Sequence, residues 1–151
     1  MEQGLMVQIC SGFSMEPADP KTYSPLALAF IGDGVFDLVI RTMVVCRANA
    51  PAHAIHEEKA AIVQAAAQAR LVQAIYDELS EEEQSVYRRG RNAKPHSIAR
   101  NASMHNYRAA TGFEALVGYL YLQNDMDRIL YLVKTGLDKI AGEIQCVTQS
   151  Q

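Results

Sequence analysis

Apolar residues recur at three- and four-residue spacing through most of the chain, and no segment alternates apolar and polar residues as a strand does. Ser24, followed by Pro25 and an apolar run as far as Val45, is typical of a capped and buried helix. Beyond Pro51 a segment without glycine or proline predicts one long helix over 51–79. The pattern therefore indicates an all-α fold.

The second half of the chain contains three further helical patterns. Ser80-Glu-Glu-Glu83 forms a capping box, which begins a short helix that ends near residue 89. Residues 90–106 are rich in turn-forming residues and predict a loop. A helix then runs to 122, and an amphipathic helix is expected over 126–140. We expect one domain over 21–142, with an N-terminal extension at 1–20 and a C-terminal tail at 143–151.

Two of the predicted helices carry an acid close to glycine, in Gly32-Asp33-Gly34 and Gly112-Phe113-Glu114. A charged carboxylate among apolar residues is costly unless it has a partner or a cation. Each glycine in a helix interior costs about 1 kcal/mol relative to alanine. The two around Asp33 therefore indicate close approach of another backbone or of a ligand, although tight helix packing alone is an alternative. Asp37 is interpreted mainly as an ion-pair partner of Arg41, one turn later.

The two acids suggest a chemistry if their helices cross. Converging carboxylates from Asp33 and Glu114 suit a hard cation such as Mg²⁺. Such an ion polarises a phosphodiester oxygen and lowers the pKa of an attacking water. Two acids satisfied within a helix interface are an equally good interpretation of the residues alone.

The charge is distributed unevenly along the chain. Six of the 14 basic residues and none of the 17 acids fall between Ser85 and Phe113. A basic segment on an acidic protein can attract phosphates to one face while the rest repels them. A solvated loop is the alternative. The basic residues are Arg88, Arg89, Arg91, Lys94, Arg100 and Arg108.

The composition is that of one ordinary globular domain of 151 residues with 49% hydrophobic and 21% charged residues. Three cysteines without ligand-like spacing suggest neither a disulfide framework nor a zinc site. The N-terminus lacks the pattern of a secretory leader, and charges interrupt the longest apolar run, so no membrane partner is expected. We expect a soluble, cytoplasmic protein.

The two acidic motifs resemble those of the ribonuclease III family. Residues 30–39, Phe-Ile-Gly-Asp-Gly-Val-Phe-Asp-Leu-Val, are similar to its signature helix, and residues 111–122 are similar to its second acidic helix. Arg89-Gly-Arg-Asn-Ala-Lys94, between them, also matches, and with the Thr-Gly-Phe-Glu form of the second motif it resembles the Mini-ribonuclease III branch. The resemblance covers about 23–140 and implies the helical bundle of a ribonuclease III endonuclease domain.

The resemblance also implies roles for residues. Asp33 and Glu114 match the family's catalytic, Mg²⁺-linked acids. Leu26, Ala29 and Thr111 stand where larger members have acids, a reduced set that the Mini branch shares. This departure leaves open how many metals bind. No duplex-RNA-binding domain follows residue 151, so the six basic residues are expected to bind the RNA, and His96 is an alternative phosphate contact.

The implied function is a Mg²⁺-dependent endoribonuclease that cleaves double-stranded RNA, leaves 5′-phosphates and matures the ends of precursor large-subunit (23S) ribosomal RNA. A homodimer would cut both strands of the duplex. Whether a ribosomal protein is a further partner is left open. Two alternatives belong to other classes, namely a non-catalytic module that binds duplex RNA or the ribosome, and an all-α metal-dependent phosphohydrolase acting on nucleotides.

Overall fold

The computed structural model describes residues 3–47, 49, 51–94 and 103–149, and this part of the chain forms seven α-helices and two short 3₁₀ helices. No strand occurs among these residues, so the all-α prediction is confirmed. The α-helices are α1 (Leu5–Gly12), α2 (Pro25–Arg47), α3 (Ala52–Val63), α4 (Ala65–Ile75), α5 (Glu81–Asn92), α6 (Met104–Leu122) and α7 (Met126–Gln149), and the 3₁₀ helices are η1 (Pro20–Thr22) and η2 (Tyr76–Glu78).

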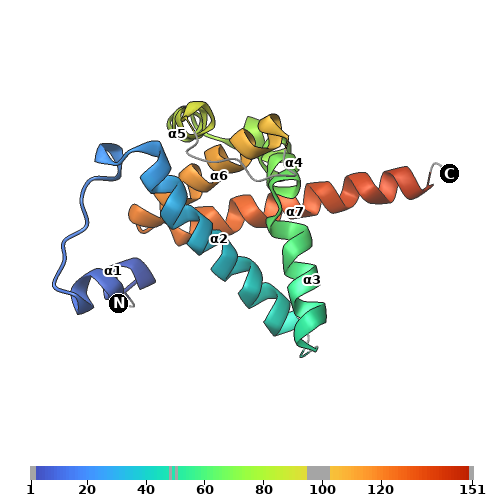
Figure 1. The fold of residues 1–151 in the computed structure, drawn as a ribbon, viewed down its shortest axis with the longest axis horizontal. Helices are drawn as coiled ribbons and strands as arrows, with labels where there is room; N and C mark the ends of the chain where they lie inside the picture. Colours follow the sequence, from blue (N-terminus) through green and yellow to red (C-terminus); the bar gives the residue numbers. More distant parts are fainter. Residues whose placement is uncertain (1–2, 48, 50, 95–102, 150–151) are drawn as a thin grey trace.

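Helix α6 lies at the centre of the bundle and packs against α2, α4, α5 and α7 (Figure 1). All its residues from Ala109 to Tyr121 are buried except Glu114. The rings of Phe36 on α2 and Phe113 on α6 pack edge to face with centroids 5.2 Å apart. Packing alone does not explain why an acid, Glu114, stands in this otherwise buried stretch.

The predicted helix starts at Ser24 and Ser80 are confirmed. The hydroxyl of Ser24 accepts a hydrogen bond from the backbone N–H of Ala27 at 3.2 Å. Ser80 and Glu83 form the reciprocal capping box, with N···O distances of 3.1 and 2.8 Å. These bonds satisfy N–H groups that the first turn of a helix leaves without partners.

The long helix predicted over 51–79 is wrong, because the chain breaks it at Gln64. Gln64 has an extended backbone, with φ −60° and ψ 149°, so α3 ends at Val63 and α4 begins at Ala65. The side-chain amide of Gln68 donates to the carbonyl of Val63 at 2.8 Å. In a continuous helix that carbonyl would accept from the backbone four residues on, so the amide replaces the bond that the break removes.

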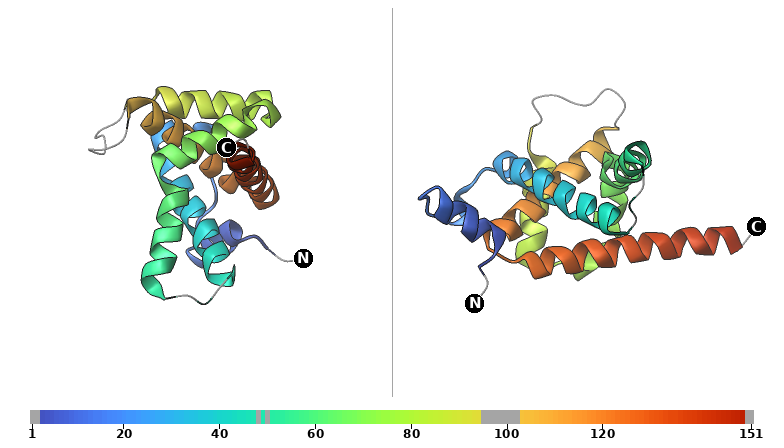
Figure 2. Two further views of the ribbon diagram at one scale, coloured as in Figure 1. Left: turned by 90° about the vertical axis from the view of Figure 1, so that its right-hand side faces the viewer. Right: turned by 90° about the horizontal axis from the view of Figure 1, so that it is seen from below.

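One additional helix and two helix ends also differ from the prediction. Helix α1, in the expected N-terminal extension, has Met6 buried and is joined to the bundle by an extended segment (Figure 1). Helix α5 continues through Gly90 to Asn92, so the expected loop starts later, and residues 95–102 lie outside the described part. Helix α7 runs past Ile140 to Gln149 and extends beyond the other helices (Figure 2).

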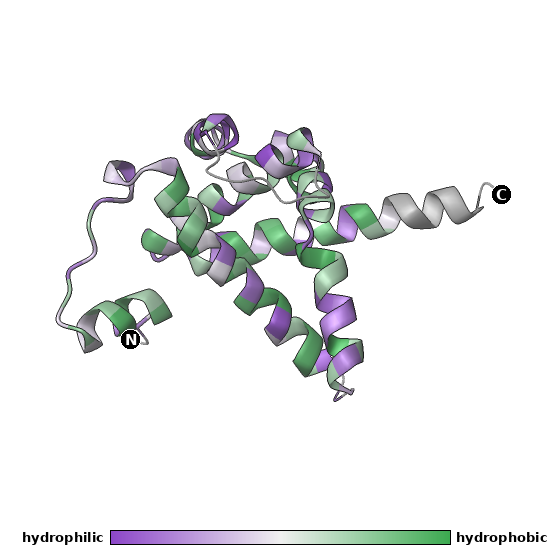
Figure 3. Cartoon of the chain, in the orientation of Figure 1, coloured by the Kyte–Doolittle hydropathy of each residue, from purple (hydrophilic) through white to green (hydrophobic). Residues whose placement is uncertain are grey.

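None of the helices in the described ranges is both long enough and apolar enough to cross a membrane. Helix α5 is largely hydrophilic, and polar positions interrupt the apolar face of α2 (Figure 3).

Candidate active site

Helices α2 and α6 approach each other closely where two glycines face the opposite backbone. A Cβ atom added to Gly32 would lie 1.7 Å from the carbonyl oxygen of Glu114, and one added to Gly118 would lie 2.0 Å from that of Leu28. No side chain fits at either position. The prediction of a close backbone approach is confirmed at Gly32, whereas Gly34 has open space around it.

This crossing brings Asp33 and Glu114 into electrostatic contact. Asp33 is exposed on α2, and Glu114 is partly buried on α6. Burial, followed by the negative charge of Asp33, raises the pKa of Glu114 to about 7, and the hydrogen bond from Gln68 opposes that rise. The two acids predicted from the sequence therefore lie close together, and the charge of Asp33 disfavours the charged form of Glu114.

Gln68 is a buried polar member of this site that the sequence did not single out. Its side chain is 2% exposed, and its Nε2 donates to Oε1 of Glu114 at 3.2 Å as well as to Val63. One amide therefore links the break between α3 and α4 to the orientation of the Glu114 carboxylate. The Oε1 atom of Gln68 is buried and has no hydrogen-bond partner among the described residues.

The donor set fits a hard cation. The carboxylates of Asp33 and Glu114 and the amide oxygen of Gln68 offer oxygen atoms only, which is what Mg²⁺ prefers. Within the described ranges no basic side chain forms an ion pair with either acid. Nor do these residues contain a group of three or more His, Cys, Asp or Glu side chains placed to hold a metal, so protein carboxylates would supply only part of a shell.

Asp37, four residues after Asp33, shows the contrasting case of a compensated acid. It pairs with Arg41 at 2.5 Å, as predicted, and with Lys59 at 2.8 Å. Burial alone would raise its pKa, but the hydrogen bonds and charges of Lys59 and Arg41 lower it below its ordinary value. Asp37 is therefore a structural acid, while Asp33 and Glu114 have no such cation among the residues that the structure describes.

Thr111 lies one helical turn before Glu114. It is buried, and its hydroxyl donates to the carbonyl of Tyr107 at 3.0 Å. That bond within α6 uses the only hydrogen of the hydroxyl.

The predicted RNA-binding residues fall on more than one side of α5. Arg91 and Arg108 line one hollow of about 400 Å³ between the end of α5 and the start of α6. Arg89 lines a different hollow, together with Lys21 and Glu82. Arg88 and Lys94 are exposed, while Arg100 and His96 lie outside the described residues.

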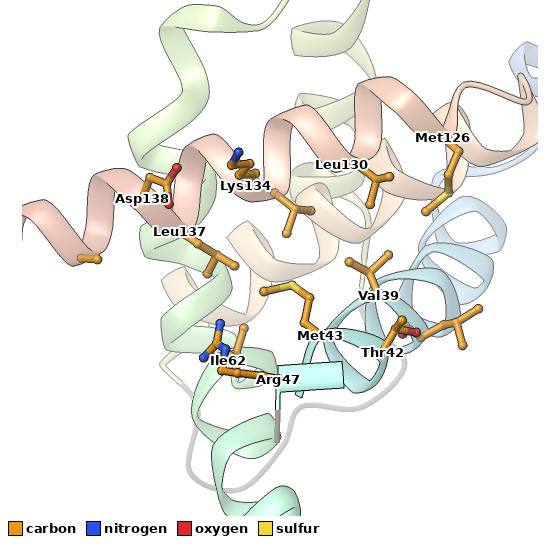
Figure 4. Close-up of a pocket in the computed structure, with 13 residues that line it drawn as sticks. Val39, Thr42, Met43, Arg47, Ile62, Met126, Leu130, Lys134, Leu137 and Asp138 are labelled. Atoms are coloured by element: carbon orange, nitrogen blue, oxygen red, sulfur yellow. The ribbon is translucent and has the colours of Figure 1, made fainter. Parts of the chain in front are cut away.

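A large hollow with an apolar lining lies away from both acids. It measures about 770 Å³ and is formed by α2, α3 and α7 (Figure 4). Leu38, Met43, Leu130 and Leu137 line it, with Arg47, Lys134 and Asp138 at its edge. An apolar lining offers little to a polyanion, so we do not assign the catalytic site to this hollow.

Comparisons with known proteins agree on one family. The Ribonuclease III domain matches residues 26–125. A Mini-ribonuclease 3 of Thermoanaerobacter sp. (strain X514) is 47% identical over 117 residues, covering 78% of this chain and 82% of that protein. A Mini-ribonuclease 3 of Enterococcus faecalis is 40% identical over 124 residues, covering 81% of this chain and 94% of that protein.

A solved structure extends the agreement to the fold. A crystal structure of a protein from Fusobacterium nucleatum superposes with a TM-score of 0.72 at 29% identity, covering 83% of this chain and 98% of that one. The matched domain contains both acids and the helix crossing that joins them. The chain therefore belongs to the ribonuclease III family, resembles its Mini-ribonuclease 3 members most specifically, and is an endoribonuclease.

Proposed function

We propose that this endoribonuclease hydrolyses phosphodiester bonds of double-stranded RNA with Mg²⁺ held by Asp33 and Glu114, and that it leaves 5′-phosphates. The observation that carries the proposal is the convergence of these two acids at the α2–α6 crossing, with the pKa of Glu114 raised by burial and by Asp33. In the described part of the chain these two carboxylates have no cationic partner, and binding of a divalent cation would offset the cost of bringing them together.

The proposed cation would be held by Asp33 and Glu114, and water and substrate phosphates would complete its shell. Bound there, Mg²⁺ supplies a Lewis acid that polarises a phosphodiester oxygen and lowers the pKa of water. Gln68 fixes the Glu114 carboxylate through its Nε2 bond, and the open space around Gly34 gives a nucleic-acid backbone access to Asp33.

We propose that the basic residues predicted from the sequence, Arg88, Arg89, Arg91, Lys94, Arg100 and Arg108, contribute contacts to the RNA. Duplex RNA presents mainly phosphates and 2′-hydroxyls to a protein, which guanidinium and ammonium groups can bind without reading sequence. Arg88, Arg89, Lys94 and Arg108 are exposed, and their position in the basic segment of a chain of net charge −3 supports this role.

The native target we propose is the base-paired stem at the ends of precursor 23S ribosomal RNA, in the cytoplasm, cut by a homodimer with one site per strand. The rRNA target is what the resemblance to the Mini-ribonuclease III branch implies. The exposed aromatic side chain of Phe30, on α2 beside the site, supports a dimer, because aromatic residues commonly anchor protein interfaces.

The test is cleavage of a duplex RNA stem from precursor 23S ribosomal RNA by the purified chain, with Mg²⁺ or with EDTA. We expect both strands to be cut with Mg²⁺, and no cutting with EDTA or by the variant Asp33→Asn. Arg41→Gln is a matched control, since Arg41 pairs with Asp37 on the same helix, and it should cleave at close to the wild-type rate. Cleavage by Asp33→Asn at the wild-type rate would refute the role of the acid. RNA that is bound but left intact would indicate the non-catalytic module instead.

A further inference from the structure

The hollow at the junction of α5 and α6 is lined by four side chains that can donate hydrogen bonds. Arg91 and Asn92 come from the last turn of α5, and Met104, His105 and Arg108 come from the first turns of α6. A second hollow of about 310 Å³ shares Arg91 and His105 with it, so the two lie next to each other.

Arg91 is held in position before any ligand binds. Its guanidinium carbon lies 5.6 Å from the centroid of the buried Tyr87 ring, and its Nε is 3.4 Å from the Oδ1 of Asn92. Tyr87 is itself fixed by an edge-to-face contact with Tyr76 at 5.7 Å. The other four N–H groups of the guanidinium make no hydrogen bond within the described ranges, so they are oriented and available for a ligand.

The charge of this hollow is positive. Neither Arg91 nor Arg108 forms an ion pair in the part of the chain that the structure describes. The start of α6, capped by Ser103, adds the partial positive charge of a helix N-terminus. Asp77 lines the second hollow, and it is the one carboxylate among the residues that line the two. Two guanidinium groups therefore outweigh one acid.

The hollow around Arg89 also contains one acid, but there the acid is paired with one of the two cations. Glu82 accepts a hydrogen bond from Tyr119 and lies 3.7 Å from the ammonium of Lys21. This carboxylate offsets part of the charge that Arg89 and Lys21 contribute. Of the two basic hollows, the one that contains Arg91 is the better site for an anion.

We propose that Arg91, His105 and Arg108 form a phosphate cradle that binds a backbone phosphate of the RNA other than the one that is cleaved. Arg108 precedes Glu114 by six residues on α6, which separates them by about 9 Å along the helix axis. A phosphate in the cradle therefore lies away from the acid pair, and binding there sets the position of the duplex. The inference rests on the proposed function, since it specifies how that enzyme holds its RNA.

Binding is measured first, with a fluorescent duplex RNA and proteins that carry Asp33→Asn so that the RNA stays intact. Arg91→Gln and Arg108→Gln are each expected to weaken binding about tenfold and to lower the slope of log affinity against log salt by about one. His105→Gln, which keeps a donor, should weaken it less. The matched control is Lys134→Gln, which removes one positive charge from α7 and should change affinity less than about twofold.

Cleavage by proteins with Asp33 intact then separates positioning from chemistry. The cradle variants should raise KM while leaving kcat near the wild-type value. Wild-type affinity and salt slope in Arg108→Gln would overturn the cradle; its side chain is exposed, so this variant is expected to fold. If the unsubstituted enzyme neither binds nor cuts duplex RNA, the proposed function fails instead, and the two failures are distinct.

Discussion

At the residue scale, Glu114 links the proposed metal site to the stability of the fold. Its folded-state pKa of about 7 lies above the ordinary value of 4.5, so the folded chain holds a proton that the unfolded chain has released between these values. Stability without metal therefore falls as pH rises through that window, by up to about 3 kcal/mol in all.

The pH dependence can be measured by urea unfolding in EDTA at about pH 5 and about pH 8. We expect wild type to lose stability over this range relative to Glu114→Gln, whose side chain does not titrate. Added Mg²⁺ should restore stability to wild type at the higher pH, because the cation binds the ionised carboxylate. The same pH dependence in both proteins would show that Glu114 does not carry the effect.

The site residues differ in how far the sequence could predict them. Asp33 and Glu114 were predictable, since an acid beside glycine in an apolar helix is a local pattern. Gln68 was not, because its burial depends on the break at Gln64, which no glycine or proline marks. A glutamine in an alanine-rich helix is ordinarily a surface residue, and only the tertiary contact with Glu114 distinguishes it.

At the element scale, the crossing of α2 and α6 fixes the distance between the acids, and two glycines of the same motif allow a matched test. Gly32→Ala would place a Cβ 1.7 Å from the Glu114 carbonyl, a backbone atom that can move only with α6. We expect a loss of about 3 kcal/mol or more and a large fall in RNA cleavage.

Gly34→Ala is the control, since nothing lies within 4 Å of the added atom. In a helix interior this change should raise stability by about 1 kcal/mol. Thermal unfolding measures the stability of the two variants relative to wild type. Equal effects would mean that the crossing is not constrained by Gly32.

The junction of α5 and α7 depends on one bidentate ion pair. The guanidinium of Arg128 binds both oxygens of the buried Glu83 at 2.9 and 2.8 Å and the carbonyl of Glu78 at 2.9 Å. Burial alone would raise the pKa of Glu83, but the hydrogen bonds and charge of Arg128 lower it. Stability from this pair is therefore present near neutral pH and lost as pH falls through the lowered pKa.

Arg128→Met should cost about 3 kcal/mol near neutral pH, because it leaves the buried carboxylate of Glu83 without a cation. Lys139→Met, which removes the exposed pair with Glu78, should cost far less. Urea unfolding at neutral and acidic pH measures both. A loss for Arg128→Met that stays unchanged in acid would contradict the electrostatic explanation.

Helices α2, α5, α6 and α7 followed from the sequence pattern, but the directions in which their side chains point did not. The sequence placed six basic residues in one segment, whereas a period of 3.6 residues turns Arg89 and Arg91 toward different hollows. The break at Gln64 and the helix at Leu5–Gly12 likewise depend on packing against the bundle. Helix propensity describes only the local sequence, so it does not predict either feature.

At the scale of the whole molecule, the distribution of charge limits how RNA can approach. The residues outside the segment from Ser85 to Phe113 include eight basic residues and all 17 acids, so that part of the chain is strongly acidic. The repulsion from this part and the attraction to Arg91 and Arg108 act together, and they orient a polyanion before any contact forms. A duplex has two strands, however, and one acid pair can cut only one of them in a single binding event.

Cutting both strands therefore favours a second copy of the chain, and Phe30 provides the test. It is 84% exposed on α2, three residues before Asp33. Phe30→Asp should shift the protein from dimer to monomer in sedimentation velocity, and it should change the products from double-strand cuts to nicks in single strands. Phe13→Asp, at a ring 75% exposed on α1, is the matched control and should remain dimeric. A wild-type chain that stays monomeric while cutting both strands at once would refute the dimer, because two opposed phosphodiesters would then be reaching one Asp33–Glu114 pair.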